Sequence, residues 1–437
     1  MPPPRESPPR PDAALLRACA RLTLDAVSRA RLAAAASAVT NWDALIDLAA
    51  RNGVIAFLHR HLVAPDSSWS RAVDPSACEP SPIPMVRGGR PQDDRNGNDV
   101  GSTEIVAIPA DAAARIRGLH RENAHRALRL AGELRRVVDL LAATGIESLP
   151  YKGPTLAMQA YGDLSMRGYV DLDLLVRPED APRALAALAD GGFVAEYDFT
   201  PARDRCFRRV DGDYPLLHRE TGTLLELHCR PSSTRFLVPL ETDALLRRAV
   251  PVALGGTTVP APAPDDLPLI LAAHGAKHRW RRLEWLAAIA ELLRREAIDP
   301  RALLERAAEM HARRTLLLAL HLAHHLLDVP LPDDVLREME DDEALAPLAA
   351  EAEALMFAPE DDGGGDREET AANLRYNLRA RDGAVDRARY AWRWLTLPSP
   401  EDWAWRELPD ALFPAYRALR PLRLLLRYAA PRAREAR

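Results

Sequence analysis

The chain has 437 residues, of which 47% are hydrophobic, so it is long enough for two or three domains with real cores. Its net charge of −5 argues against general nucleic-acid binding. Four cysteines without metal spacing and a polar, proline-rich start predict a cytoplasmic protein without a disulfide framework or a signal peptide. No apolar run approaches the ~20 residues of a membrane span.

The first 108 residues contain one helical region between two segments that lack periodic apolar residues. Residues 1–11 are proline-rich and are expected to be a disordered tail, whereas residues 12–64 are typical of helices. Residues 65–108 carry many prolines and the run GGRPQDDRNGND, which predicts a disordered insertion. The overall richness in Ala, Arg and Pro indicates a bacterial genome of high GC content.

Residues 109–260 alternate between helical and strand patterns. A long helix is predicted from Pro109 to Thr144, with Gly145 as its stop. The elements predicted after it are strand 146–151, helix 155–161, strand 169–176, helix 178–190, strands 193–197, 206–210, 216–219 and 223–229, helix 241–250 and hairpin 252–259. The predicted fold class is α+β: a small mixed sheet with extensive flanking helices.

The remainder of the chain is typical of helices with one interruption. A helical domain is predicted at 261–358, a flexible link at 359–367 and a C-terminal helical region at 368–437, in which 368–395 forms one longer helix. Arginines interleaved with leucines near the end predict an amphipathic basic helix. It either docks on the helical domain or touches a membrane or a partner protein.

Two aspartates stand two residues apart in the apolar strand 169–176. Because side chains alternate along a strand, Asp171 and Asp173 point to the same face, and adjacent carboxylates repel each other unless a cation neutralises them. Glu226, in the apolar strand 223–229, adds a third carboxylate if that strand lies beside the first. Three such groups suit two hard cations, which bridge phosphate oxygens and lower the pKa of an attacking hydroxyl. We therefore expect a two-metal Mg²⁺ site, with Mn²⁺ as the alternative cation.

A glycine turn precedes the aspartates. Gly153 stands between a strand and a helix, where its backbone N–H is able to approach phosphates closely. The sequence Lys152-Gly153-Pro154, then a helix, Arg167 and the two aspartates resembles the uncharacterised bacterial nucleotidyltransferase family of the DNA polymerase β-like superfamily. The resemblance is strongest over 145–192.

The resemblance implies roles for these residues. The aspartates and Glu226 would bind the metals and be catalytic, and the nucleotide would contact Lys152, Gly153, Pro154 and Arg167. Two residues depart from the superfamily pattern. Pro154 replaces a serine or glycine and removes an N–H, and Glu226 replaces an aspartate.

Histidines near these motifs have more than one interpretation. The segment His274-Gly-Ala-Lys277-His278 has a counterpart in the family, which implies that His274 and Lys277 contact the nucleotide; packing is the alternative. His274 and His278 also have zinc spacing, but no third ligand is near them in sequence. His228 either assists the metal site or hydrogen-bonds to a loop.

These patterns predict a metal-dependent nucleotidyltransferase that moves a nucleoside monophosphate from an NTP such as ATP to an acceptor hydroxyl and releases pyrophosphate. The acceptor is a protein, a small molecule or an RNA end. One alternative is a sugar or phosphosugar transferase that modifies a peptide natural product with the same metal site. The other is a catalytically degenerate nucleotide sensor or antitoxin-like partner, which Pro154 and Glu226 keep open. The sequence leaves the acceptor, the base preference and the oligomeric state open.

Overall fold

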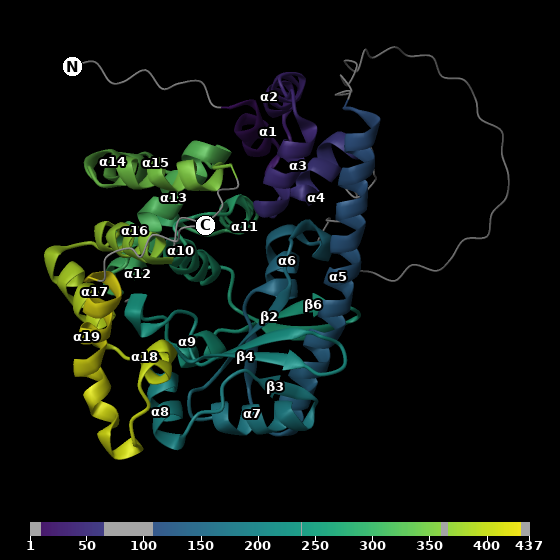
Figure 1. Ribbon diagram of the computed structural model, residues 1–437. Coiled ribbons are helices and arrows are strands. Elements are labelled where there is room, and N and C mark those ends of the chain that lie inside the picture. The colour runs from purple at the N-terminus through teal and green to yellow at the C-terminus, as the bar shows by residue number, and fades with distance from the viewer. Residues whose placement is uncertain (1–9, 65–107, 237, 360–365, 430–437) are drawn as a thin grey trace, which may run out of the picture.

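The structure is a computed structural model that describes residues 10–64, 108–236, 238–359 and 366–429 (Figure 1). Most of the predicted disordered tail, of the insertion at 65–108 and of the link at 359–367 lies outside the described residues. No helix in the described ranges is long and apolar enough to cross a membrane.

A five-stranded mixed sheet with the order β1-β2-β5-β4-β3 lies at the centre of the fold. Its strands are β1 (Ser148–Pro150), β2 (Asp171–Val176), β3 (Phe193–Ala195), β4 (Asp213–His218) and β5 (Leu224–His228). The pair β2–β5 is parallel, whereas the other three pairs are antiparallel. The expected mixed sheet with flanking helices is therefore confirmed, and β5 lies directly beside β2.

Helices and a small hairpin surround this sheet. They are α5 (Ala110–Ala143), α6 (Gly153–Tyr161), the 3₁₀ turn η3 (Leu164–Met166), α7 (Ala181–Asp190), α8 (Pro201–Val210), the turn η4 (Thr234–Phe236), α9 (Thr242–Arg247) and the hairpin β6–β7 (Val250–Leu254, Thr257–Ala261). The α5 side chains Leu130, Leu134 and Leu141 are buried in one hydrophobic cluster with Leu172 and Leu174 of β2. This packing turns Asp171 and Asp173 toward the opposite face.

The N-terminal helices and the helices after the hairpin share a second hydrophobic cluster, which also receives side chains of β1 and α6. The N-terminal elements are α1 (Pro11–Cys19), α2 (Ala26–Ser37), α3 (Trp42–Arg51), α4 (Ile55–Leu58) and the π-helical turn η1 (His59–Val63). The later ones are α10 (Leu267–Lys277), α11 (Leu283–Arg295), α12 (Pro300–Glu309), α13 (Arg313–Leu327), α14 (Asp333–Asp341) and α15 (Leu345–Met356). Whether the chain divides into domains at the expected residues stays a prediction.

The C-terminal helices lie along one side of the molecule (Figure 1). They are α16 (Asp366–Arg379), α17 (Ala384–Thr396), α18 (Pro400–Trp405), the 3₁₀ turn η5 (Asp410–Ala415) and α19 (Tyr416–Ala429). Trp403 and Tyr416 belong to the hydrophobic cluster of the sheet. The basic helix α19 therefore begins with a residue packed in the cluster of the sheet, so its expected docking on the helical domain is wrong. Tyr376 of α16, by contrast, belongs to the second cluster, which the helical region forms.

Two predicted elements differ from the structure. Residues 206–210 are not a strand but the end of α8, which begins after the capping residue Thr200 and buries Phe207 and Val210. The single helix expected at 368–395 is broken between α16 and α17. There the Asp382 carboxylate accepts hydrogen bonds from the backbone N–H groups of Arg313 and Arg314, at 3.0 and 2.7 Å. Asp382 thus caps the first turn of α13 instead of continuing a helix.

Candidate functional site

Acidic side chains from three neighbouring strands meet on the face of the sheet that points away from α5. In the parallel β2–β5 pair, Asp173 lies directly opposite Glu226. In the antiparallel β4–β5 pair, Asp213 lies directly opposite His228. Residues that face each other across a strand pair share a face of the sheet, so Asp171 joins this group two residues before Asp173. The structure thus brings together the three carboxylates singled out in the sequence.

Lys152 supplies the main counter-charge. Its Nζ lies 2.8 Å from Oδ1 of Asp173, and the two side chains are only 9% and 7% exposed. The backbone explains this meeting, because β1 runs antiparallel to β2 and delivers Lys152 to the beginning of β2. Burial alone would raise the pKa of Asp173, but the charges of Lys152 and His228 outweigh it and hold that pKa well below its usual range.

His228 connects the carboxylates of β2 and β5. Its Nε2 lies 3.1 Å from Oε2 of Glu226 and 3.3 Å from Oδ1 of Asp173, yet makes no well-aligned hydrogen bond to either oxygen. Burial disfavours the imidazolium form, but the two carboxylates outweigh burial and raise the pKa of His228. The contact with His228 lowers the pKa of Glu226, whose side chain is 43% exposed. Glu226 is therefore ionised at neutral pH and open to a ligand.

Asp171 has a different environment from Asp173. Burial first, and then the negative charges of Asp173 and Glu226, raise the pKa of Asp171. In the described part of the chain, the ligand atoms that lie within 4.8 Å of one another belong to Asp173, Glu226 and His228. The structure therefore groups a histidine with two of the expected metal ligands and places Asp171 at the edge of the group.

The glycine turn lies next to the aspartates. Gly153 begins α6 with a φ of +58°, a backbone conformation that favours glycine, and a Cβ added there would lie 3.5 Å from the backbone oxygen of Asp171. Pro154 occupies the first turn of α6 and is buried. The N-terminus of α6, where backbone N–H groups lack helical partners, is thus beside the carboxylates, as a phosphate site requires.

Arg167 offers a positive charge close by. The residue is buried, and its guanidinium lies 5.8 Å from the centre of the Tyr169 ring. It forms no ion pair with any residue that the structure describes, although its charge favours the ionised form of Asp171. A buried arginine without a carboxylate partner is well suited to receive an anionic ligand.

The His274–His278 segment lies at the end of α10, and His274 is close enough to Lys152 and Asp173 to interact with them electrostatically. Burial, followed by the charge of Lys152, lowers the pKa of His274 well below its ordinary value, so its imidazole is neutral. Its ring packs edge-on against Trp285, with centroids 4.9 Å apart, which supports the packing interpretation for the ring. Lys277 lies over the Phe236 ring at 6.0 Å and forms no ion pair with any described residue.

The sequence interpretation missed Asp213, which lies between the predicted strands 206–210 and 216–219. Asp213 is the first residue of β4, and burial raises the pKa of its carboxyl while the charges of His228 and Lys277 oppose that change. The predicted strand 216–219 overlaps β4 but begins after Pro215, since proline is rare in an interior strand. The alternation of Tyr214 and Leu216, both buried, was the signal that would have located it.

A family model described as "Uncharacterised nucleotidyltransferase" matches residues 38–328, about two-thirds of the chain. Among solved structures, the chain is similar to the crystal structure of an antigenic nucleotidyltransferase-like protein from Paracoccidioides brasiliensis. The two are 15% identical with a TM-score of 0.30, over 49% of this chain and 98% of the other. No curated protein sequence matches the chain.

Proposed function

We propose that this chain, which belongs to the family of uncharacterised nucleotidyltransferases, transfers a nucleoside monophosphate from an NTP to an acceptor hydroxyl. The acceptor oxygen forms a bond to the α-phosphorus, the bond from that phosphorus to the β-phosphate oxygen breaks, and pyrophosphate leaves. The hydroxyl proton passes to a carboxylate. A protein, a small molecule and an RNA end are all acceptors of suitable chemistry.

The observation that carries this proposal is the parallel pairing of β2 with β5. It sets Glu226 opposite Asp173 beside the Gly153 turn, although these two residues are 53 positions apart in the sequence. Carboxylates on adjacent strands next to a helix N-terminus form a site for a cation-bound phosphate. A solvated acidic surface would need neither the glycine turn nor the buried Lys152.

The donor set fits a divalent cation. Asp171, Asp173 and Glu226 bring three carboxylates to one face, against the positive charges of Lys152 and the nearby Arg167 and a titratable histidine. His228 Nε2 is buried near two carboxylates without an aligned hydrogen bond. Carboxylate oxygens suit Mg²⁺, and the imidazole makes Mn²⁺ the alternative cation. When bound, such a cation supplies neutralisation of phosphate charge and a lower pKa for the acceptor hydroxyl.

The residues around the carboxylates have separate tasks in this proposal. The backbone at Gly153 donates N–H groups to the phosphates, and Arg167 and Lys152 offset their negative charge. Lys277 approaches the nucleotide from α10. Glu226 is ionised and partly exposed, and it accepts the proton of the acceptor hydroxyl.

The Lys152–Asp173 ion pair favours a second candidate, a protein that binds a nucleotide without transferring it. The ammonium already neutralises the central carboxylate at 2.8 Å, so a cation must compete with it. If Lys152 does not leave Asp173 when NTP binds, the site is a nucleotide sensor. Comparison of binding with turnover separates the two candidates.

The test uses the full-length protein, Mg²⁺ and a lysate from a bacterium that carries a close relative of this protein. Each NTP is supplied once with an α-phosphate label and once with a γ-phosphate label. Nucleotidyl transfer attaches only the α-label to an acceptor and releases the γ-label in pyrophosphate. A γ-label on the acceptor would instead indicate phosphoryl transfer and would refute the proposal.

Matched variants identify the site. Glu226→Gln removes the exposed carboxylate, and Glu220→Gln makes the same change on the exposed turn between β4 and β5. We expect transfer to fall at least about 100-fold in the first variant, the scale of a lost proton acceptor, and to stay unchanged in the second. NTP binding without transfer in the wild-type protein would support the sensor instead.

A further inference from the structure

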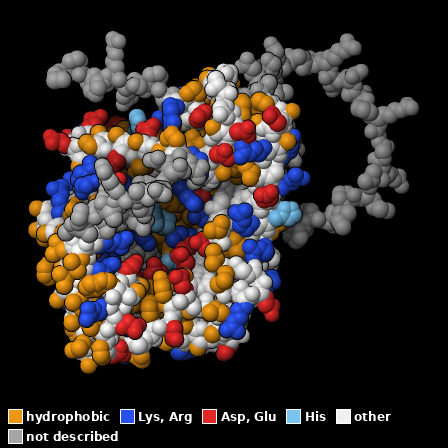
Figure 2. All heavy atoms as spheres, in the orientation of Figure 1, with side chains coloured by type: hydrophobic (Ala, Val, Ile, Leu, Met, Phe, Trp, Pro, Cys, Tyr) orange, Lys and Arg blue, Asp and Glu red, His pale blue; other side chains and the backbone are white. Residues whose placement is uncertain are grey.

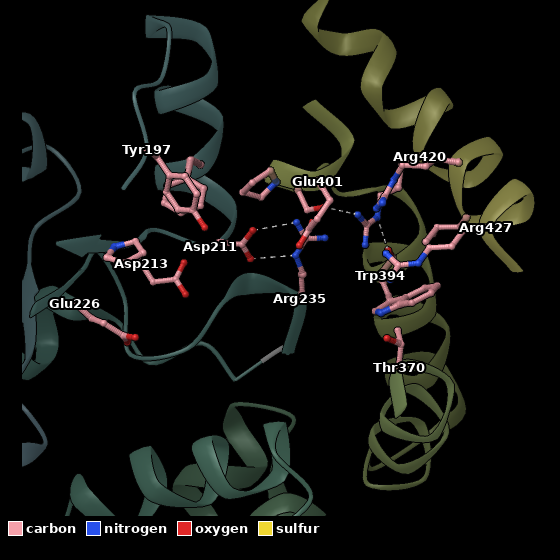
Figure 3. Close-up of a pocket in the computed structure, with 16 residues that line it drawn as sticks. Tyr197, Asp211, Asp213, Glu226, Arg235, Thr370, Trp394, Glu401, Arg420 and Arg427 are labelled. Carbon is pink, nitrogen blue, oxygen red and sulfur yellow. Dashed lines mark hydrogen bonds and ion pairs between the residues drawn. The ribbon is translucent and has the colours of Figure 1, made fainter. Parts of the chain in front are cut away.

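A cavity of about 390 Å³ opens between the sheet and the C-terminal helices (Figure 3). This volume lies within the range of about 300–1,000 Å³ that is typical of small-molecule sites. Glu226 and Asp213 stand at its sheet end, whereas neither Gly153 nor Lys152 lines it. The cavity therefore begins at the exposed carboxylate of the site and extends away from the turn proposed to hold the nucleotide's phosphates.

The opposite wall is basic. Arg420 and Arg423 of α19 both contact the one carboxylate of Asp402, the former at 2.7 Å. Arg427 follows four residues after Arg423 on the same helix face, and it forms no ion pair with any described residue. Glu401 adds one more carboxylate to this wall, so three guanidinium groups face two carboxylates. Acidic and basic side chains also meet in the middle of the face shown in Figure 2.

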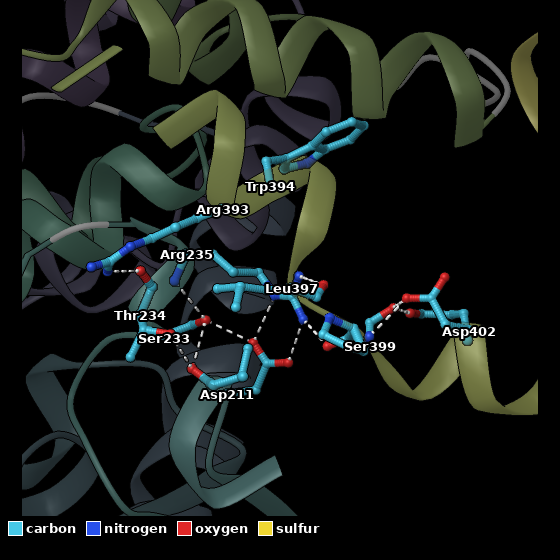
Figure 4. A network of polar contacts seen from close by, with 12 residues as sticks. Asp211, Ser233, Thr234, Arg235, Arg393, Trp394, Leu397, Ser399 and Asp402 are labelled. Atoms are coloured by element: carbon cyan, nitrogen blue, oxygen red, sulfur yellow. Dashed lines mark hydrogen bonds and ion pairs between the residues drawn. The ribbon is translucent and has the colours of Figure 1, made fainter. Parts of the chain in front are cut away.

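The two walls are held together by a polar network (Figure 4). Arg235 donates hydrogen bonds to both oxygens of Asp211, at 3.0 and 3.1 Å, and to the backbone oxygens of Leu397 and Pro398 at 2.6 and 2.5 Å. Arg235 is buried, and it links the end of α8 to the start of the loop before α18. The basic wall is thus fixed relative to the sheet and does not need a ligand to form.

Aromatic rings flank the space between the walls. Tyr197 lines it from the sheet side and Trp394 from α17, where the Arg420 guanidinium lies 5.8 Å from the indole centre. Such surfaces accept planar or ring-shaped ligands. All of the basic wall comes from residues beyond 328, outside the range matched by the family model.

We propose that this cavity is the acceptor site and that the acceptor carries an anionic group, a phosphate or a carboxylate, in addition to its reactive hydroxyl. The anionic group lies against Arg427, whose planar guanidinium binds either oxyanion through paired hydrogen bonds. The hydroxyl lies toward Glu226. The assignment of the hydroxyl end rests on the proposed function, whereas the anion at Arg427 does not. In this proposal, residues 38–328, which the family model matches, supply the transfer site, and the C-terminal helices select the acceptor.

The test measures binding to the full-length protein by calorimetry, without NTP, using three probes that share one ring. Glucose 6-phosphate carries a phosphate, glucuronate a carboxylate and glucose neither. We expect at least one anionic probe to bind about 10-fold or more tightly than glucose, in line with charge-assisted hydrogen bonds. The tighter of the two anionic probes identifies the chemical source of the charge.

Two variants on one helix locate the binding. Arg427→Gln removes the guanidinium proposed to bind the anion, and Arg417→Gln makes the same change on an exposed part of α19 outside the cavity. We expect the first to abolish the preference for the anionic probe and the second to keep it. Equal binding of all three probes, or equal loss in both variants, would overturn the proposal. Arg427→Lys, which keeps the charge, distinguishes a lost contact from a folding defect.

A final arm adds Mg²⁺ and ATP. Because the acceptor and the nucleotide occupy separate places in the proposal, ATP leaves probe binding intact. If ATP displaces the probe and Arg427→Gln weakens ATP itself, the arginines hold the nucleotide and the acceptor assignment is wrong. If neither ATP nor any of the other three NTPs binds while the probe still depends on Arg427, the proposed nucleotidyl transfer fails but the anion site stands.

Discussion

Replacing the buried aspartate of the site by its amide, Asp173→Asn, is expected to destabilise the protein. The substitution keeps the shape of the side chain but removes the charge that Lys152 contacts at 2.8 Å, in a pair less than a tenth exposed. The ammonium is then left buried without an anion. Breaking such a pair from one side costs about 3–5 kcal/mol of unfolding free energy. Because the amide oxygen still accepts a hydrogen bond, we expect a value near the lower limit.

The neighbouring substitution, Asp171→Asn, is expected to have the opposite sign. Burial and the charges of Asp173 and Glu226 raise the pKa of Asp171, so its ionised form is disfavoured in the folded protein. Removing that charge relieves repulsion between carboxylates and should leave stability unchanged or raise it by up to about 1 kcal/mol, the range for cross-strand charge pairs. Both variants should lose Mg²⁺-dependent transfer, although only Asp173→Asn should lose stability.

Thermal unfolding at pH 7 measures this contrast. A loss of about 3 kcal/mol corresponds to a drop in Tm of roughly 6–12 °C for a cooperative unit of 150–250 residues. We therefore expect Asp173→Asn to melt clearly below the wild type and Asp171→Asn to melt at or above it. Equal melting temperatures for the two variants would refute the reasoning, since the Lys152 pair would then contribute nothing that Asp171 lacks.

Three further predictions follow from the same geometry. Because the folded-state pKa of Asp173 is depressed, the stability that its ionised form contributes is lost as the pH falls below its ordinary pKa. The stability difference between wild type and Asp173→Asn should therefore shrink below about pH 4, and a difference at pH 3 as large as that at pH 5 would contradict this. Gly153→Ala places a side chain at a φ of +58° and should lower the unfolding free energy, measured with urea, by roughly 1–2 kcal/mol. The same substitution should weaken Mg²⁺–ATP binding, and unchanged binding would argue against a phosphate at this turn. Gly275→Ala would put a Cβ 2.4 Å from the fully buried Trp280 ring and should cost about 1–3 kcal/mol, to be checked by urea unfolding; a neutral result would mean that the ring moves freely.

Local patterns predicted most of the sheet because they depend on neighbouring residues only. The alternation around Asp171 and Asp173 placed both carboxylates opposite the core, as β2 does. Gly145 and Gly153 both have a positive φ in the structure. The expected end of the long helix at Gly145 and the expected turn at Gly153 are therefore confirmed. The failure at 206–210 also has a local cause. Five residues are too few to distinguish period 2 from period 3.6, and the helix start Thr200-Pro201 lay outside that window.

The sequence by itself indicated three carboxylates, a lysine–glycine turn and an arginine as the residues of the candidate site, all within the range that the family model matches. Only the tertiary structure decided that Lys152 and His228 contact Asp173, and that Arg427 of α19 faces the cavity that Glu226 lines. The contacts of Lys152 and His228 with Asp173 depend on which strands pair. The cavity depends on Trp403 and Tyr416 entering the core of the sheet. Burial of apolar surface is non-directional, so a sequence shows that a helix has a face to bury without showing where that face is buried.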